Sequence, residues 1–106
     1  MLFTTTDSLP GYQIQSVLGI VTGNVVQSKH VGRDIMAGLK GIVGGELKGY
    51  TEMMSEARDK AIQRLVAEAN KLDADAVVGI RFTTSAILAG SSELLAFGTA
   101  VKLQRA

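Results

Sequence analysis

The chain has no cysteine and no tryptophan, and it has one proline and one histidine among its 106 residues. Without cysteine it has no disulfide, no thiolate metal ligand and no cysteine nucleophile, a composition that suits a reducing compartment. No apolar run approaches the roughly 20 residues of a membrane helix, and no basic stretch followed by an apolar one opens the sequence. We therefore expect a cytoplasmic protein with no membrane partner.

An excess of positive or negative charge is also nearly absent. The 11 Lys and Arg residues balance 10 Asp and Glu, which leaves a net charge of +1 and no broad attraction for nucleic acid. We find no serine in a nucleophile elbow and no carboxylate pair in a setting that would separate their pKa values. A chain of this length forms one domain, residues 1–106. The sequence thus favours a protein that is not an enzyme and does not bind nucleic acid.

The hydrophobic pattern predicts a two-layer α+β fold in which one long helix covers a small antiparallel sheet in the order β-α-β-β. We expect a short extended arm, a first strand, the helix and two further strands at residues 2–6, 12–27, 51–72, 76–84 and 93–103, respectively. Thr51 is expected to cap the helix, and Asn70 or Asp73 to end it in a left-handed turn. Gly23 and Asn24 are expected to break or bulge the first strand, and Val78, Ile80 and Phe82 to share one face of the next. The apolar residues followed by glycine and serine at 86–92 predict a hairpin, and we expect its apolar tip to act as a contact surface.

The strands are apolar on both faces, whereas the sequence predicts a single long helix. The uncovered face therefore needs a partner, and another copy of the same chain is the simplest supplier. Small residues expected to let that copy approach closely are Gly19, Gly23, Gly79, Ala96, Gly98 and Ala100. Arg81 is a candidate for an interface ion pair. In the alternative interpretation, residues 28–49 fold back over this face within the subunit.

Three segments together resemble the YbjQ-like family of small bacterial proteins: residues 21–58, the strand ADAVVGIRF at 74–82, and LLAFGTAVKL at 94–103. The similarity covers essentially the whole chain, and Asp73 departs from the glycine that the family usually has there. The resemblance implies a β-α-β-β subunit of dodecin-like topology that assembles through extra short strands into a ring, a pentamer in the known folds of the family. The family is also labelled as heavy-metal-binding, so the resemblance implies that property for this chain.

The residues offer limited support for such a metal. Soft metals prefer thiolate and imidazole, and the chain has only His30. His30 and Asp34 would share a helical face, and Glu46 and Glu52 could add carboxylates for a divalent metal ion. In the alternative interpretation His30 is a hydrogen-bonded loop residue, and Met53 and Met54 likewise pack rather than bind copper. A symmetric ring can bring together copies of a residue that one chain supplies singly.

The glycine-rich segment 28–49 carries Lys29, Arg33 and Lys40, which could bind an anion or a nucleotide-type small molecule. It lacks the Gly-Lys-Ser/Thr ending of a phosphate loop, so a loop packed at a subunit interface is the competing interpretation. The sequence leads us to expect a non-enzymatic, self-associating binding or scaffold protein whose ligand lies between subunits, with an anion binder as the alternative.

Overall fold

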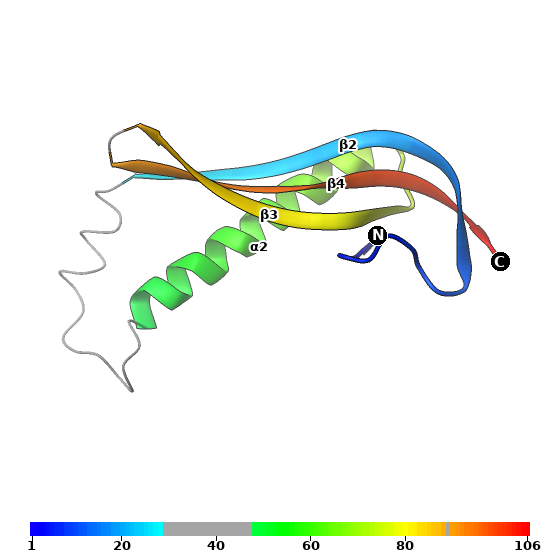
Figure 1. Ribbon diagram of the computed structural model, residues 1–106, viewed down its shortest axis with the longest axis horizontal. Coiled ribbons are helices and arrows are strands. Elements are labelled where there is room, and N and C mark those ends of the chain that lie inside the picture. Colours follow the sequence, from blue (N-terminus) through cyan, green and yellow to red (C-terminus); the bar gives the residue numbers. More distant parts are fainter. Residues whose placement is uncertain (29–47, 89) are drawn as a thin grey trace.

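The computed structural model describes residues 1–28, 48–88 and 90–106. Within them the chain forms strand β1 (Leu2–Phe3), strand β2 (Tyr12–Ser28), helix α2 (Lys48–Lys71), strand β3 (Ala76–Leu88) and strand β4 (Ser91–Arg105), as Figure 1 shows. The arrangement of one long helix between strands agrees with the predicted β-α-β-β order. The two chain ends lie at the same end of the molecule (Figure 1), where the amide of Ala106 donates to the carbonyl of Gly11 over 3.1 Å.

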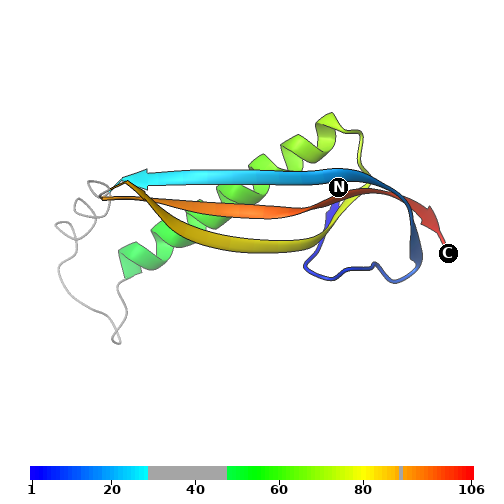
Figure 2. The ribbon, with the colours of Figure 1, turned by 45° about the horizontal axis from the view of Figure 1, so that its top comes forward.

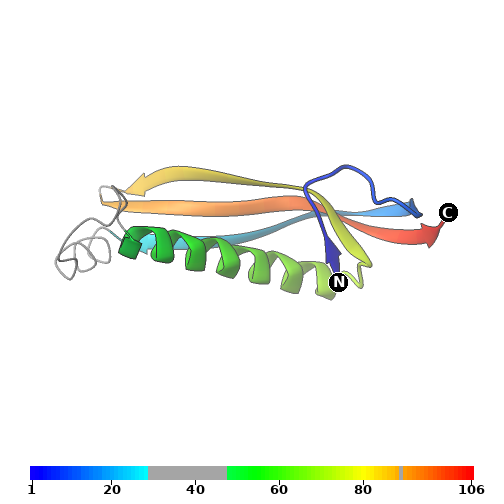
Figure 3. The same cartoon turned by 90° about the horizontal axis from the view of Figure 1, so that it is seen from below.

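The sheet has four strands in the order β1-β3-β4-β2. The three long strands pair antiparallel as predicted, but β1 pairs parallel with β3, which makes the sheet mixed. Helix α2 crosses one face of the sheet obliquely (Figure 2). Figure 3 shows the helix on that face and the loop after β1 on the other. We call the face opposite α2 the outer face.

The main core lies between α2 and the sheet. On the helix, Ala61, Leu65 and Ala69 are fully buried at the three- and four-residue spacing that the sequence shows. They pack against Val21, Val77, Ile80, Ala96 and Ala100 of the sheet. A second, smaller cluster of Ala76, Val78 and Val101 lies at one end of the sheet, with Leu9 and Leu103 packed against it.

Strand β2 continues through Gly23 and Asn24, so the predicted break there is wrong. Gly23 pairs with Ala96 and Asn24 with Leu95 in unbroken register, and the irregularities lie earlier, between Ile14 and Ser16 and between Val17 and Gly19. Gly23 has another role, because a methyl group there would overlap the backbone of α2 at Ala61 and Leu65. The glycine allows the helix to lie directly on the strand.

Strand β3 contains a bulge that the alternation of its residues does not reveal. Val78 pairs with Thr99 and Arg81 with Phe97, so two residues of β3 lie opposite one residue of β4. Gly79 takes the positive φ of 63° that the bulge requires. As a result Val77 and Ile80 both join the helix-facing core, and the predicted shared face of Val78, Ile80 and Phe82 is wrong.

The helix begins at Lys48, before the predicted start, so Thr51 lies inside α2 and does not cap it. The predicted end is confirmed: the helix stops at Lys71, and Asp73 adopts the left-handed conformation with φ of 58°. Within the described residues, α2 is too polar to form a membrane span.

Candidate functional site

Most of the residues that the sequence singled out for ligands lie outside the described residues. These are His30, Asp34 and Glu46 of the metal hypothesis, and Lys29, Arg33 and Lys40 of the anion hypothesis. Glu52 is described, and it lies exposed on α2. The described residues therefore do not test whether the predicted ligands come together, and both hypotheses stay predictions.

The spacing of acidic and imidazole side chains decides whether the described residues can hold a metal ion. In residues 1–28, 48–88 and 90–106, no group of three or more His, Asp or Glu side chains lies close enough to hold one. Two carboxylates lie near one lysine at the surface: Nζ of Lys102 is 3.5 Å from Asp73 and 3.7 Å from Asp75. The lysine pairs with both aspartates, and the amide of Leu103 donates to Asp75. This part of the chain does not fit a metal centre within one subunit.

Arg81 and Gly79 bind the amino-terminal arm of their own chain. The Arg81 guanidinium donates through Nη1 to the carbonyl of Thr5 over 2.7 Å and to that of Ile80 over 2.8 Å. The amide of Gly79 donates to Thr6 over 2.8 Å, and the amide of Ile80 donates to Thr4 over 3.1 Å. The bulge and the arginine thus hold the arm against β3. These contacts lie within one chain, so the interface ion pair of Arg81 stays a prediction.

Ala96 and Gly98 were expected on a face open to another copy, and the structure places them elsewhere. Both are buried on the helix-facing side, where Ala96 belongs to the core under α2. A methyl group on Gly98 would lie 2.8 Å from Cγ1 of Val77 and 3.1 Å from Cγ1 of Ile80. The predicted position was wrong because strand alternation separates two faces without showing which one the helix covers.

The outer face carries the exposed apolar residues. Because Val21 and Val25 face α2, alternation places Ile20 and Val26 on the outer face. Ile20 is 79% exposed, Val26 57% and Val17, which lies opposite Val101, 66%. Phe97 of the neighbouring strand β4 adds a partly exposed ring to this face. The sequence predicted an uncovered apolar face, and within residues 1–28, 48–88 and 90–106 the structure agrees with that prediction. The alternative interpretation, in which residues 28–49 fold back over this face, lies almost entirely outside the described residues.

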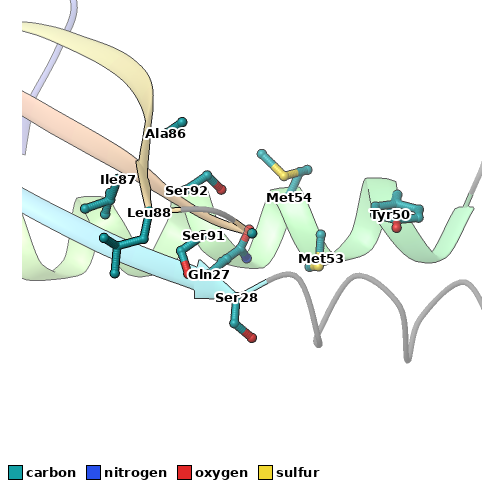
Figure 4. Close-up of a pocket in the computed structure, with 11 residues that line it drawn as sticks. Gln27, Ser28, Tyr50, Met53, Met54, Ala86, Ile87, Leu88, Ser91 and Ser92 are labelled. Atoms are coloured by element: carbon teal, nitrogen blue, oxygen red, sulfur yellow. The ribbon is translucent and has the colours of Figure 1, made fainter.

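A hollow of about 660 Å³ lies on the other side of the sheet, between the first half of α2 and the end of the β3–β4 hairpin (Figure 4). Its lining comes from the end of β2, from the helix and from the hairpin. These residues are Gln27, Ser28, Tyr50, Met53, Met54, Ala86, Ile87, Leu88, Gly90, Ser91 and Ser92. Sequence reasoning pointed to the apolar hairpin tip as a contact surface, but it missed that the helix methionines lie beside it.

The fold is that of a small α+β domain, and known proteins are similar to this chain either in sequence or in fold. A family model described as "Putative heavy-metal-binding" matches residues 1–104, so the chain belongs to the YbjQ-like family. A protein from Psychromonas ingrahamii is 70% identical, with 99% of this chain and all of that protein covered. One from Thermotoga maritima is 56% identical, with 99% of each covered. Both carry the name UPF0145 protein.

A solved structure has the same fold at low sequence identity. It is a DUF74-family protein of unknown function from Pediococcus pentosaceus, with a TM-score of 0.60 and 20% identity over 98% of each chain. At this identity the likeness concerns the fold alone.

Proposed function

We propose that this protein is a non-enzymatic binding or scaffold protein of the cytoplasm that assembles with copies of itself through the outer face of its sheet. The observation that carries the proposal is the exposure of Val17, Ile20 and Val26 on that face of β2. Monomeric proteins seldom leave a contiguous apolar patch uncovered, because water-exposed apolar area is unfavourable and promotes association.

The occupant that we propose for the outer face is another copy of the chain. Most soluble oligomers consist of identical subunits in closed symmetry, and the family resemblance implies a ring of five. Among the described residues, the amino-terminal arm covers one end of this face, through Leu9 on the second core cluster. A neighbouring subunit is our proposed cover for the exposed residues of β2.

The ligand that we propose is a divalent metal ion bound between subunits. Support comes from the description of the family model and from the possibility that symmetry gathers copies of His30, Asp34, Glu46 and Glu52. Since one chain supplies a single histidine, His30, we expect binding to depend on assembly.

Light scattering of two matched variants tests the assembly. Ile20→Glu places a carboxylate on the outer face, and we expect it to lower the mass of the particle because a buried unpaired charge disfavours the interface. Ala67→Glu adds the same charge at an exposed position of α2, and we expect it to leave the mass unchanged. If the two variants have equal mass, the outer face is not the interface.

Elemental analysis of protein purified without an affinity tag tests the metal. We expect a divalent metal to accompany the assembled protein and to be lost in His30→Ala, with the mass of the particle retained. Metal-free protein that is still assembled would contradict the metal proposal and leave the self-association standing.

A further inference from the structure

The hollow beside the hairpin has the size of a small-molecule site. Its volume of about 660 Å³ falls within the roughly 300–1,000 Å³ range of ligand pockets in proteins. Figure 4 shows Tyr50, Met53 and Met54 along the helix, with Ile87 and Leu88 at the end of β3. Helix α2 and the strands β2, β3 and β4 thus all contribute to one concave surface.

The described residues that line the hollow carry no charged side chain. Met53, Met54, Ala86, Ile87 and Leu88 supply most of its surface, and the amide of Gln27 with the hydroxyls of Ser28, Ser91 and Ser92 supplies polar groups at one side. A charged ligand would lose water against these residues without gaining a counter-charge from them, which is costly. The described part of the lining is therefore complementary to a neutral molecule.

The apolar wall of the hollow is open to solvent. Leu88 is 73% exposed and Ile87 47% exposed, so a ligand that covers them removes apolar surface from water. The thioethers do not form a soft-metal site, because Met53 and Met54 point to different sides in Figure 4, as neighbours on a helix do.

We propose that the hollow binds a small neutral organic molecule, whose apolar body lies against Met54, Ile87 and Leu88 and whose hydrogen-bonding end meets Gln27 and the serines. This site lies beside α2, and Val17, Ile20 and Val26 of the outer face do not line it. The inference therefore does not rest on the proposed assembly or on its metal.

Titration with a neutral solvatochromic dye, Nile red, tests the proposal on the whole protein. We expect saturable binding with one dye per chain, and much weaker binding of the anionic dye anilinonaphthalene sulfonate. Leu88→Gln removes apolar wall without adding charge, and we expect it to weaken Nile red binding about tenfold. Leu72→Gln is the matched control, since Leu72 is 43% exposed and does not line the hollow. Absence of saturable binding, or an equal effect of both variants, overturns the proposal.

A second variant keeps the test decisive if Leu88→Gln changes the fold or the mass of the particle. Ser92→Asp places a carboxylate in the lining from an exposed position, and we expect it to weaken the neutral dye about tenfold as well. Gln63→Asp, exposed on α2 and outside the hollow, is its control. Circular dichroism and light scattering identify the variants that retain the wild-type fold and mass. Unchanged Nile red affinity in a correctly folded Ser92→Asp protein overturns the proposal.

Discussion

Gly23 of β2 lies directly against Ala61 of α2, so close that a methyl group on the glycine would overlap the carbonyl oxygen of Ala61. The amide nitrogen of Leu65 closes the same space. Backbone meets backbone here, and neither group can move without shifting the helix. This contact sets the distance between the two layers of the fold and leaves the outer face without cover from α2.

Gly23→Ala is therefore expected to destabilise the protein strongly. Overpacking against side chains costs about 1–3 kcal/mol, and overlap with a helix backbone places this variant at the upper end of that range or above it. Urea denaturation measures the change. Thr22→Ala, at the exposed neighbouring position, should change the free energy of unfolding by less than about 1 kcal/mol. Equal stability of the two variants would mean that the helix does not lie on Gly23.

Gly79 makes a different prediction, because its constraint is conformational. Its φ of 63° is unfavourable for residues with a Cβ, while the nearest atom to an added Cβ is Oδ1 of Asp7 at an ordinary 3.6 Å. Gly79→Ala should cost about 1–2 kcal/mol, and Gly79→Asn should cost less because asparagine tolerates the left-handed region. Thermal denaturation of both variants gives the order. A more stable alanine variant would contradict the bulge.

Leu65 tests the core under the helix. Its side chain is fully buried, so Leu65→Ala should lower the free energy of unfolding by about 2–5 kcal/mol through lost burial and the cavity that remains. Leu72→Ala, at a position that is 43% exposed, should lose clearly less. Chemical denaturation in parallel compares them, and similar losses would speak against the described position of α2.

Arg81 is predicted to hold the amino-terminal arm. Arg81→Ala removes the hydrogen bonds to the carbonyls of Thr5 and Ile80, and we expect the arm to open more often. The amides of Gly79 and Ile80, which donate to the arm, should then exchange their hydrogens faster. Hydrogen exchange read by NMR or mass spectrometry follows these amides. Exchange as slow as in the wild type would show that the backbone hydrogen bonds hold the arm without Arg81.

Much of the fold could be predicted from the sequence because periodicity reflects burial directly. An apolar stripe at three- and four-residue spacing indicated the helix: Met54, Ala57, Ala61, Leu65 and Leu72, with Ile62 and Ala69 beside them. Ala57, Ala61, Leu65 and Ala69 of this set are buried, whereas Leu72 is 43% exposed. The bulge at Gly79 could not be predicted, since one extra residue exchanges the faces of everything after it and leaves the composition unchanged. The role of Gly23 was missed for a related reason: close approach of a helix depends on tertiary packing.

The candidate site was less predictable than the fold. The outer face could be predicted because the strands are apolar on both faces and the sequence predicts a single long helix. The small residues Ala96 and Gly98 were assigned to this face, although they lie on the opposite one. Ala96 and Gly98 lie under α2 because the helix packs closely there, and no pattern within β4 shows which face is covered. The predicted ligands His30, Asp34 and Glu46 lie outside the described residues and stay a prediction from resemblance.

Sedimentation velocity of the wild-type protein at micromolar concentration tests the central claim, that copies of this chain cover the outer face of the sheet. Our account predicts one species with several times the mass of a single chain, and five times that mass if the ring implied by the resemblance forms. A species with the mass of one chain would contradict it, because Val17, Ile20 and Val26 would then stand exposed in solution.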